Sequence, residues 1–199
     1  DLGTGSGVIP LLLWRREKKL KILGLEIQKS LADLAIKNVA INNLDEVIQI
    51  IHGDLRKLKG EWLGKWDVLI SNPPFFMEKE GNLSPNREKA MARHELACKL
   101  EDVVTAAKKL SKRRGRFLLI HRVERLAEIL ALFEEKGFSL SRLAFVHEHQ
   151  EAEAKLVLVE GRADIKISPK VLPPILLKND DGSDTDRMRR LFAGGNLYT

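Results

Sequence analysis

The stretch that decides the fold is Asp1-Leu2-Gly3-Thr4-Gly5-Ser6-Gly7, a glycine-rich turn, together with the apolar run Val8-Ile9-Pro10-Leu11-Leu12-Leu13 that follows it. A proline near the beginning of such a run predicts the start of a helix. Glycines have no Cβ, so the backbone can approach a ligand, and the N-terminus of the helix offers unpaired N–H groups. A dinucleotide-binding fingerprint would have its third glycine where Val8 stands. The spacing therefore favours a nucleotide without a pyrophosphate.

Two short apolar segments that follow the turn each lead to an acidic residue. Residues 21–26 predict a strand that ends in Glu26, about 20 residues beyond the glycines, where nucleotide-binding α/β units place a carboxylate on the ribose hydroxyls. The alternative is a solvated glutamate at a strand end. Residues 47–52 predict a second strand, followed by Asp54, which we expect to accept a hydrogen bond from the exocyclic amine of an adenine.

A rigid corner follows the predicted strand at residues 66–71. It consists of Asn72-Pro73-Pro74-Phe75, in which two prolines fix φ and remove two backbone donors. The corner presents an amide side chain, free carbonyl oxygens and an aromatic ring, which together suit a planar amine. Asn72 Oδ1 and the Pro73 carbonyl would accept its two hydrogens, and Phe75 would stack on it. The alternative is a proline-capped turn with a phenylalanine in the core.

The order of predicted elements defines an α/β fold. Helices are expected at residues 30–42 and 101–110, and an apolar stripe over residues 123–133 predicts a third helix that ends at Gly137. A strand is expected at residues 116–121. Residues 138–146 and 154–160 are two strands with too little chain between them for a crossover, so they should form an antiparallel hairpin. The sheet is therefore mostly parallel, with helices on both faces, and its strand ends meet at one edge.

These motifs, in this order, resemble class I S-adenosylmethionine (SAM) methyltransferases that methylate amino groups. The chain is similar in particular to the bacterial tRNA (adenine-N6)-methyltransferases that act beside the anticodon of a valine tRNA. The similarity covers nearly the whole chain. Besides the motifs above it rests on the following softer segments: residues 31–35, 92–95, 121–126, 156–161 and 172–174. The resemblance implies a Rossmann-like methyltransferase sheet and SAM as the cofactor.

The resemblance also implies roles for individual residues. The catalytic corner comprises Asn72, Pro73, Pro74 and Phe75. Cofactor binding is expected from Asp1, Gly3, Thr4, Gly5, Gly7, Glu26, Ile27, Gln28, Asp54, Leu55 and Asn72. From their placement in the chain, substrate contacts are expected from Phe76, Arg93, His94, His121 and Arg122. The alternatives are that Phe76 packs beneath the site, that Arg93 and His94 brace the loop, and that His121 and Arg122 are solvated. The expected reaction is methyl transfer to the N6 amine of an adenine in RNA, and the expected substrate is tRNA near the anticodon.

Composition and charge fit a protein that binds nucleic acid. The 199 residues, of which 44% are hydrophobic, suit one core, and we expect a single domain over residues 1–199 that lacks its N-terminal strand and any upstream segment. A net charge of +6 favours an acidic partner, although a basic protein without one is the alternative. No apolar stretch is long enough for a membrane span. The basic run from Lys108 to Arg116 either contacts RNA or is a solvated helix end.

The remaining features narrow the expected chemistry. Cys98 is the only cysteine, so an intramolecular disulfide is impossible and the reducing cytoplasm is the expected compartment. His94 and Cys98 have the spacing of metal ligands on a helix, but no second pair accompanies them, and we expect no metal. Residues 77–92 are polar and rich in turn formers, which predicts a mobile loop over the substrate or a plain surface insertion.

Three other functions remain open from the sequence. The first is methylation of a protein glutamine amide, as in the release-factor methyltransferases, whose corner has the same asparagine and prolines but usually a tyrosine where Phe75 stands. The second is guanine-N2 methylation of rRNA. The third is a non-catalytic RNA-binding module derived from a methyltransferase, which the presence of Glu26, Asp54 and Asn72 disfavours.

Overall fold

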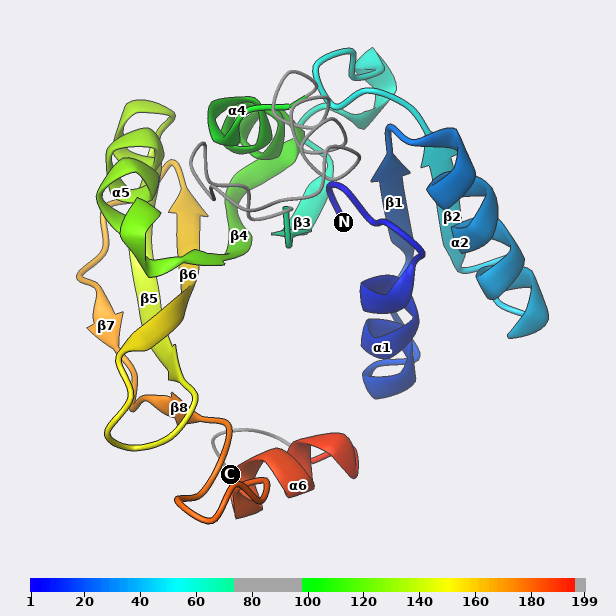
Figure 1. Cartoon of the computed structure of the whole chain (residues 1–199). Coiled ribbons are helices and arrows are strands. Elements are labelled where there is room, and N and C mark those ends of the chain that lie inside the picture. The colour runs from blue at the N-terminus through cyan, green and yellow to red at the C-terminus, as the bar shows by residue number, and fades with distance from the viewer. Residues whose placement is uncertain (74–97, 196–199) are drawn as a thin grey trace, which may run out of the picture.

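The computed structural model describes residues 1–73 and 98–195 of an α/β protein (Figure 1). In chain order its elements are α1 (Val8–Arg16), β1 (Ile22–Glu26), α2 (Lys29–Ile41), β2 (Ile48–His52), the 3₁₀ turn η1 (Gly60–Trp62), β3 (Trp66–Ser71), α4 (Leu100–Leu110), β4 (Ser111–Arg122), the 3₁₀ turn η2 (Val123–Arg125), α5 (Leu126–Glu135), β5 (Phe138–His147), β6 (Ala154–Ala163), β7 (Lys170–Val171), β8 (Ile175–Leu176) and α6 (Asp186–Phe192).

The longer strands pair as the sequence predicts. β1 runs parallel to β2, and β3 runs parallel to β4. β6 lies between β4 and β5 and is antiparallel to both, so the predicted hairpin is confirmed. The short strands β7 and β8 both pair with β5. A mostly parallel sheet that ends in an antiparallel hairpin is thereby confirmed.

Residues Asp1 to Thr4 join β1 to β3. Leu2 donates its N–H to the Ile70 carbonyl at 2.8 Å, and the Leu25 N–H donates to the Asp1 carbonyl at 2.9 Å. On the far side of the turn, Gly3 and Thr4 both donate to the Leu25 carbonyl. The chain therefore passes between two parallel strands just before it enters the glycine-rich turn.

The glycines act where the backbone needs a left-handed conformation. Gly7 has φ 82° and immediately precedes α1. Gly137 has φ 79° and donates its N–H to the Glu134 carbonyl at 3.1 Å, so it ends α5 as predicted. Several predicted boundaries differ from the structure, and two of the differences concern where an element begins. The third helix starts with the 3₁₀ turn η2, and β4 begins at Ser111, five residues before the predicted start at 116.

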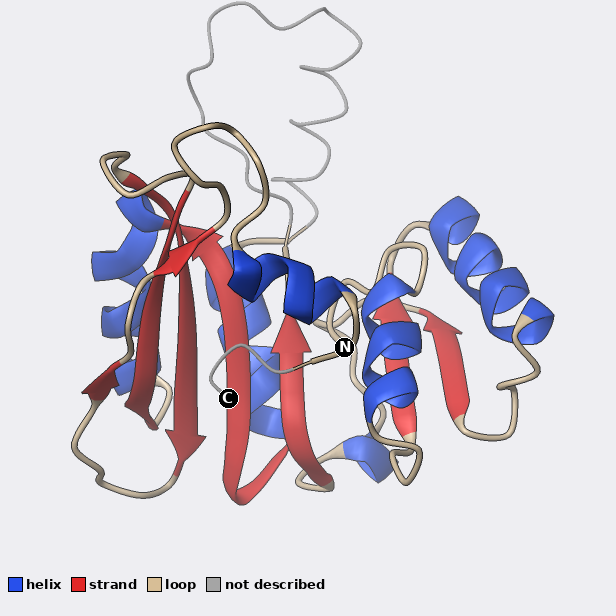
Figure 2. Cartoon of the chain, turned by 90° about the horizontal axis from the view of Figure 1, so that it is seen from below, coloured by secondary structure: helices blue, strands red, loops and turns tan. Residues whose placement is uncertain are grey.

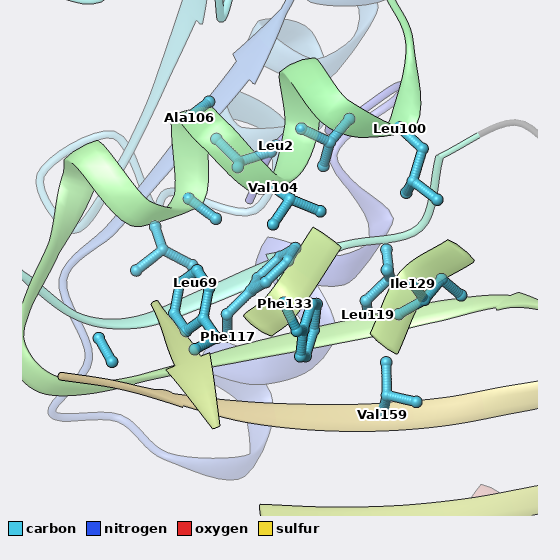
Figure 3. Packing of buried hydrophobic residues seen from close by; sticks show 14 of the residues in the cluster. Leu2, Leu69, Leu100, Val104, Ala106, Phe117, Leu119, Ile129, Phe133 and Val159 are labelled. Atoms are coloured by element: carbon cyan, nitrogen blue, oxygen red, sulfur yellow. The ribbon is translucent and has the colours of Figure 1, made fainter. Parts of the chain in front are cut away.

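The main core lies between the sheet and helices α4 and α5. Three aromatic rings, those of Phe117, Phe133 and Phe138, pack pairwise with centroids 5.5 to 5.6 Å apart. Figure 3 shows α4 residues such as Val104 packed beside Phe117 and Phe133. The rings leave no room for a side chain at Gly161, since a Cβ there would lie 2.7 Å from the Phe133 ring.

Helices lie on both sides of the strand layer, as expected (Figure 2). α4 and α5 cover the side of the main core, while α1 and α2 pack on the other side over a smaller cluster around Val39, Leu44 and Ile48. None of the helices in the described ranges is long and apolar enough to cross a membrane.

Candidate functional site

The ends of β1, β2 and β3 meet at one edge of the sheet. Glu26, the last residue of β1, pairs with His52 at the end of β2, and the Gly53 N–H donates to the Glu26 carbonyl at 2.9 Å. Ser71, the last residue of β3, pairs with Leu2, and its buried hydroxyl donates a hydrogen bond to the Leu2 carbonyl at 2.7 Å. The predicted convergence of the strand ends on the glycine-rich turn is therefore present.

The glycine-rich turn leaves open space beside its backbone. Gly3 and Gly5 have φ 74° and 56°, and a Cβ built on either residue would meet no atom within 4 Å. The positive φ values explain why these positions favour glycine, and the open space leaves the backbone approachable by a ligand.

Glu26 is buried beneath this turn rather than solvated, so the alternative of a solvated glutamate is wrong. The residue is 5% exposed. Its Oε2 accepts the Gly5 N–H at 2.8 Å, and its Oε1 accepts the Gln28 N–H at 2.9 Å. A carboxylate has about four acceptor positions, so each oxygen retains one for a ligand hydroxyl. Glu26 thus fixes the turn and the start of α2 and remains able to accept two hydroxyl groups.

Asp1 carries an acceptor that the protein does not satisfy. Its Oδ2 accepts the Thr4 hydroxyl at 2.7 Å. Its Oδ1 is buried and has no hydrogen-bond partner among the residues that the structure describes. A buried carboxylate oxygen without a donor is unfavourable. A ligand group that donates a hydrogen bond, such as an ammonium, would satisfy it.

Asp54 follows β2 and is held by Arg56, a residue that none of the sequence motifs indicates. Arg56 binds its carboxylate through the backbone N–H, Nε and Nη2, at distances of 2.7 to 3.1 Å. This pairing holds the pKa of Asp54 below its usual value. Leu55, between them, is partly buried against the main core. No periodic pattern marks Arg56; its position two residues after an aspartate is the one sequence signal.

Asn72 lies at the same edge and is exposed, whereas Pro73 is half-buried. Together with Ile9 of α1, Asn72 lines a cavity of about 460 Å³. The floor of the cavity is formed by apolar residues of β3, β4, β6 and β5, and Arg142 and Glu160 are its charged residues. The Asn72 side chain is therefore not turned into the core, which would have excluded a role at the site.

Several predicted site residues lie outside the described part of the chain. These are Pro74, Phe75, Phe76, Arg93 and His94, together with the predicted loop at residues 77–92. Within residues 1–73 and 98–195, no three histidine, cysteine, aspartate or glutamate side chains form a group that could hold a metal ion.

The expected substrate contact of His121 and its alternative, a solvated position, are both wrong. The residue is 2% exposed, and its Nδ1 accepts the Arg122 N–H at 2.8 Å. Burial lowers the pKa of His121 to about 4, with a smaller contribution from Arg125. Side chains alternate along a strand, and His121 shares the core-facing side of β4 with Phe117 and Leu119. Arg122 is half-buried and interacts with Glu124 at 3.5 Å.

The basic run belongs to the opposite edge of the sheet. Ser111 at the start of β4 pairs with Trp66 at the start of β3, far along both strands from Asn72. Two of its lysines form ion pairs there: Lys108 with Asp164, and Lys112 with Asp67 at 2.8 Å. The run is therefore not part of the site, and a contact between it and RNA stays a prediction.

The chain is similar to known methyltransferases. The family model described as the methyltransferase small domain matches residues 1–119. A Porphyromonas gingivalis protein named tRNA1(Val) (adenine(37)-N6)-methyltransferase is 34% identical over 165 residues, which cover 81% of this chain and 64% of the relative. A protein of the same name from Dyadobacter fermentans is 28% identical over 194 residues, which cover 96% of this chain and 79% of the relative. The chain thus spans less than two thirds of the Porphyromonas protein.

Solved structures share the fold. A crystal structure described as a predicted O-methyltransferase from Agrobacterium tumefaciens superposes with a TM-score of 0.78 at 19% identity, covering 100% of this chain and 89% of the other. The geranyl diphosphate C-methyltransferase of Streptomyces coelicolor, in complex with S-adenosyl-L-homocysteine, superposes with a TM-score of 0.60 at 11% identity, covering 81% and 69%. At these identities the likeness concerns the fold alone.

Proposed function

Since the chain belongs to the methyltransferase small domain family, we propose that it is a SAM-dependent N-methyltransferase that acts on the exocyclic N6 amine of an adenine in RNA. The proposed substrate is tRNA near the anticodon, in line with the names of the relatives, and the proposed compartment is the cytoplasm. The observation that carries the proposal is the placement of Asn72 and Pro73 at the same sheet edge as the glycine-rich turn and Glu26.

The described residues fit the chemical groups of SAM. Glu26 retains an acceptor on each oxygen for the two ribose hydroxyls. Asp54 offers a carboxylate for the adenine amine, and the unsatisfied Oδ1 of Asp1 suits the ammonium of the methionine part. Gly3 and Gly5 leave space for the cofactor against the turn. When bound, SAM supplies a methyl group activated by its attachment to a sulfonium.

Asn72 and Pro73 would prepare the acceptor amine. The N6 lone pair of adenine is delocalised into the ring, which makes the amine a weak nucleophile. Hydrogen bonds from the amine to Asn72 Oδ1 and to the Pro73 carbonyl would draw its hydrogens aside and favour a more tetrahedral nitrogen. The same oxygens would stabilise the positive charge that grows on the nitrogen during transfer. A separate strong base is unnecessary, because the methylated nitrogen loses its proton readily afterwards.

The substrate side of the proposal concerns residues that the structure does not describe. Phe75 would stack on the target base, Phe76 would pack beneath the site, and Arg93 and His94 would contact the RNA from the end of a substrate loop at residues 77–92. Arg122 is the remaining candidate for such a contact at the end of β4. A target base in a loop costs little free energy to expose, because it is already unstacked. We further propose that residues 1–199 form one domain with a net charge of +6 that suits RNA.

The proposal is tested by incubating the protein with labelled SAM and, separately, total tRNA, rRNA or release factor, followed by nucleoside or amino-acid analysis. We expect N6-methyladenosine in tRNA. Label in guanosine of rRNA, or in a glutamine of the release factor, would replace the proposed substrate by one of the alternatives. RNA binding without transfer to any acceptor would indicate a non-catalytic module.

The role of Asn72 is tested separately. Asn72→Ala should leave SAM binding nearly intact and lower the rate of transfer by about a hundredfold or more, the usual effect of losing one preorganised polar group that stabilises developing charge. Binding is measured by calorimetry and transfer by single-turnover kinetics. Unaltered transfer in this variant would refute the acceptor role.

A further inference from the structure

The carboxylate of Asp54 is engaged on both oxygens by one residue. Oδ1 accepts the backbone N–H and Nε of Arg56, both at 2.9 Å. Oδ2 accepts Nη2 at 2.7 Å and, more weakly, Nε at 3.1 Å. A carboxylate has about four acceptor positions, and Arg56 therefore occupies them nearly completely.

This engagement conflicts with the role that Asp54 has in the proposed function. An adenine amine needs a free acceptor position on the same carboxylate. The Asp54 side chain is only 17% exposed, whereas that of Arg56 is 42% exposed. The Arg56 guanidinium is thus the more exposed partner of the pair, and solvent can receive it when it leaves the carboxylate.

A second acid lies in the neighbourhood of Arg56. The pKa of Arg56 is raised chiefly by the hydrogen bond to Asp54, with a smaller contribution from Asp102, the second acid. Asp102 belongs to the first turn of α4, where one oxygen accepts the Lys99 N–H at 2.9 Å. A guanidinium that leaves Asp54 therefore remains near a negative charge. The backbone N–H of Arg56 is independent of this movement and can still orient Oδ1.

We propose that Arg56 competes with the adenine amine of the cofactor for Asp54, so that release of its guanidinium is part of cofactor binding. This inference rests on the proposed function and adds to it a residue that sets cofactor affinity. Arg56 lowers the affinity for the cofactor and, in the free protein, holds the Asp54 carboxylate in one position.

The competition predicts that removing the guanidinium tightens binding. Exposed ion pairs change an equilibrium constant by up to about fivefold, so Arg56→Gln should bind S-adenosylhomocysteine about two- to fivefold more tightly than the unaltered protein. S-adenosylhomocysteine is the better probe because it lacks the sulfonium charge, which would respond to the loss of a nearby cation. The measurement is titration calorimetry, with circular dichroism to confirm that the variant is folded.

Two matched controls isolate the amine. The purine analogue of S-adenosylhomocysteine, which has a hydrogen atom in place of the N6 amine, carries no N–H on its base and cannot donate to Asp54, so the affinity for it should not rise in Arg56→Gln. Arg125→Gln removes an arginine that makes a bidentate pair of the same kind, through Nε and Nη2, with Glu128 at 2.7 and 2.6 Å. Asp54 is not part of that pair. This variant should bind S-adenosylhomocysteine like the unaltered protein.

The outcomes separate the inference from the proposed function. Equal or weaker binding of S-adenosylhomocysteine by folded Arg56→Gln would overturn the competition and leave the methyltransferase assignment intact. A complete lack of binding by the unaltered protein would overturn both. Should Arg56→Gln fail to fold, Arg56→Lys serves instead, because a lysine keeps the charge but cannot bond side-on. It should tighten binding by a smaller factor, and weaker binding would overturn the inference.

Discussion

Replacement of Glu26 by alanine should destabilise the protein even without a ligand. The buried carboxylate accepts the N–H groups of Gly5 and Gln28, which belong to the glycine-rich turn and to the start of α2. Hydrogen bonds to a charged group contribute about 1.5–3 kcal/mol each. Water entering the vacated space would recover part of this, so we expect the free energy of unfolding to fall by about 2–4 kcal/mol. Typical domains have about 5–15 kcal/mol in total, so the variant should still fold.

The assay is equilibrium unfolding in urea, followed by circular dichroism, with the slope compared between variants to confirm that the transition stays two-state. Glu26→Gln keeps one acceptor and should lose less, about 1–2 kcal/mol. Glu148→Ala is the matched control, because this glutamate is exposed and paired only with surface Lys155 among the described residues. It should unfold like the unaltered protein. A Glu26→Ala variant within about 0.5 kcal/mol of the unaltered protein would refute the view that this carboxylate holds the turn.

Three other predictions concern the core, pH and salt. Gly161→Ala should lower the free energy of unfolding by about 1–3 kcal/mol, because the new Cβ would overlap the Phe133 ring. Gly60→Ala is the control and should leave that free energy unchanged, because its Cβ would meet no atom within 4 Å. Equal urea midpoints for the two variants would contradict the prediction. The pKa of His121 is about 4 when folded and about 6.5 when unfolded, so the unfolded chain binds more protons and stability falls as the pH falls from 6.5 to 4. In His121→Asn the fall in the free energy of unfolding between these pH values should be smaller by up to about 3 kcal/mol, as measured by urea unfolding at several pH values. An unchanged pH profile would refute the assignment of this effect to His121. RNA affinity should fall steeply with salt, by filter binding at 50 to about 200 mM, and a flat response would exclude a role for the basic charge.

The sequence predicted the elements where local signals were strong. Residues 66–71 form β3 with the expected bounds, and residues 30–42 form α2 with a shift of one residue at each end. Here apolar periodicity and turn residues agree. The convergence at the sheet edge followed because parallel strands place their carboxyl ends together. Glu26 was found for that reason, although its hydrogen bonds to Gly5 and Gln28 depend on the folded turn.

Side-chain direction and long-range pairing were harder to predict. His121 was placed at the correct strand end but was expected to contact the substrate, although alternation from Phe117 indicates the core side. Arg56 was missed because its pairing depends on the backbone conformation of a loop and not on any periodic pattern. β7 and β8 were not predicted, since two-residue strands exist only where the edge of β5 accepts them. Their formation is decided by tertiary contacts.

The position of Leu2 has a consequence for how the molecule responds to its ligand. Its backbone links the β1–β2 pair to the six-stranded sheet, and the turn that would hold the cofactor begins one residue later. A cofactor bound at this turn would stabilise the strands on both sides of Leu2. Its protective effect on amide exchange should therefore spread from β2 on one side to β4 on the other, well past the atoms it touches.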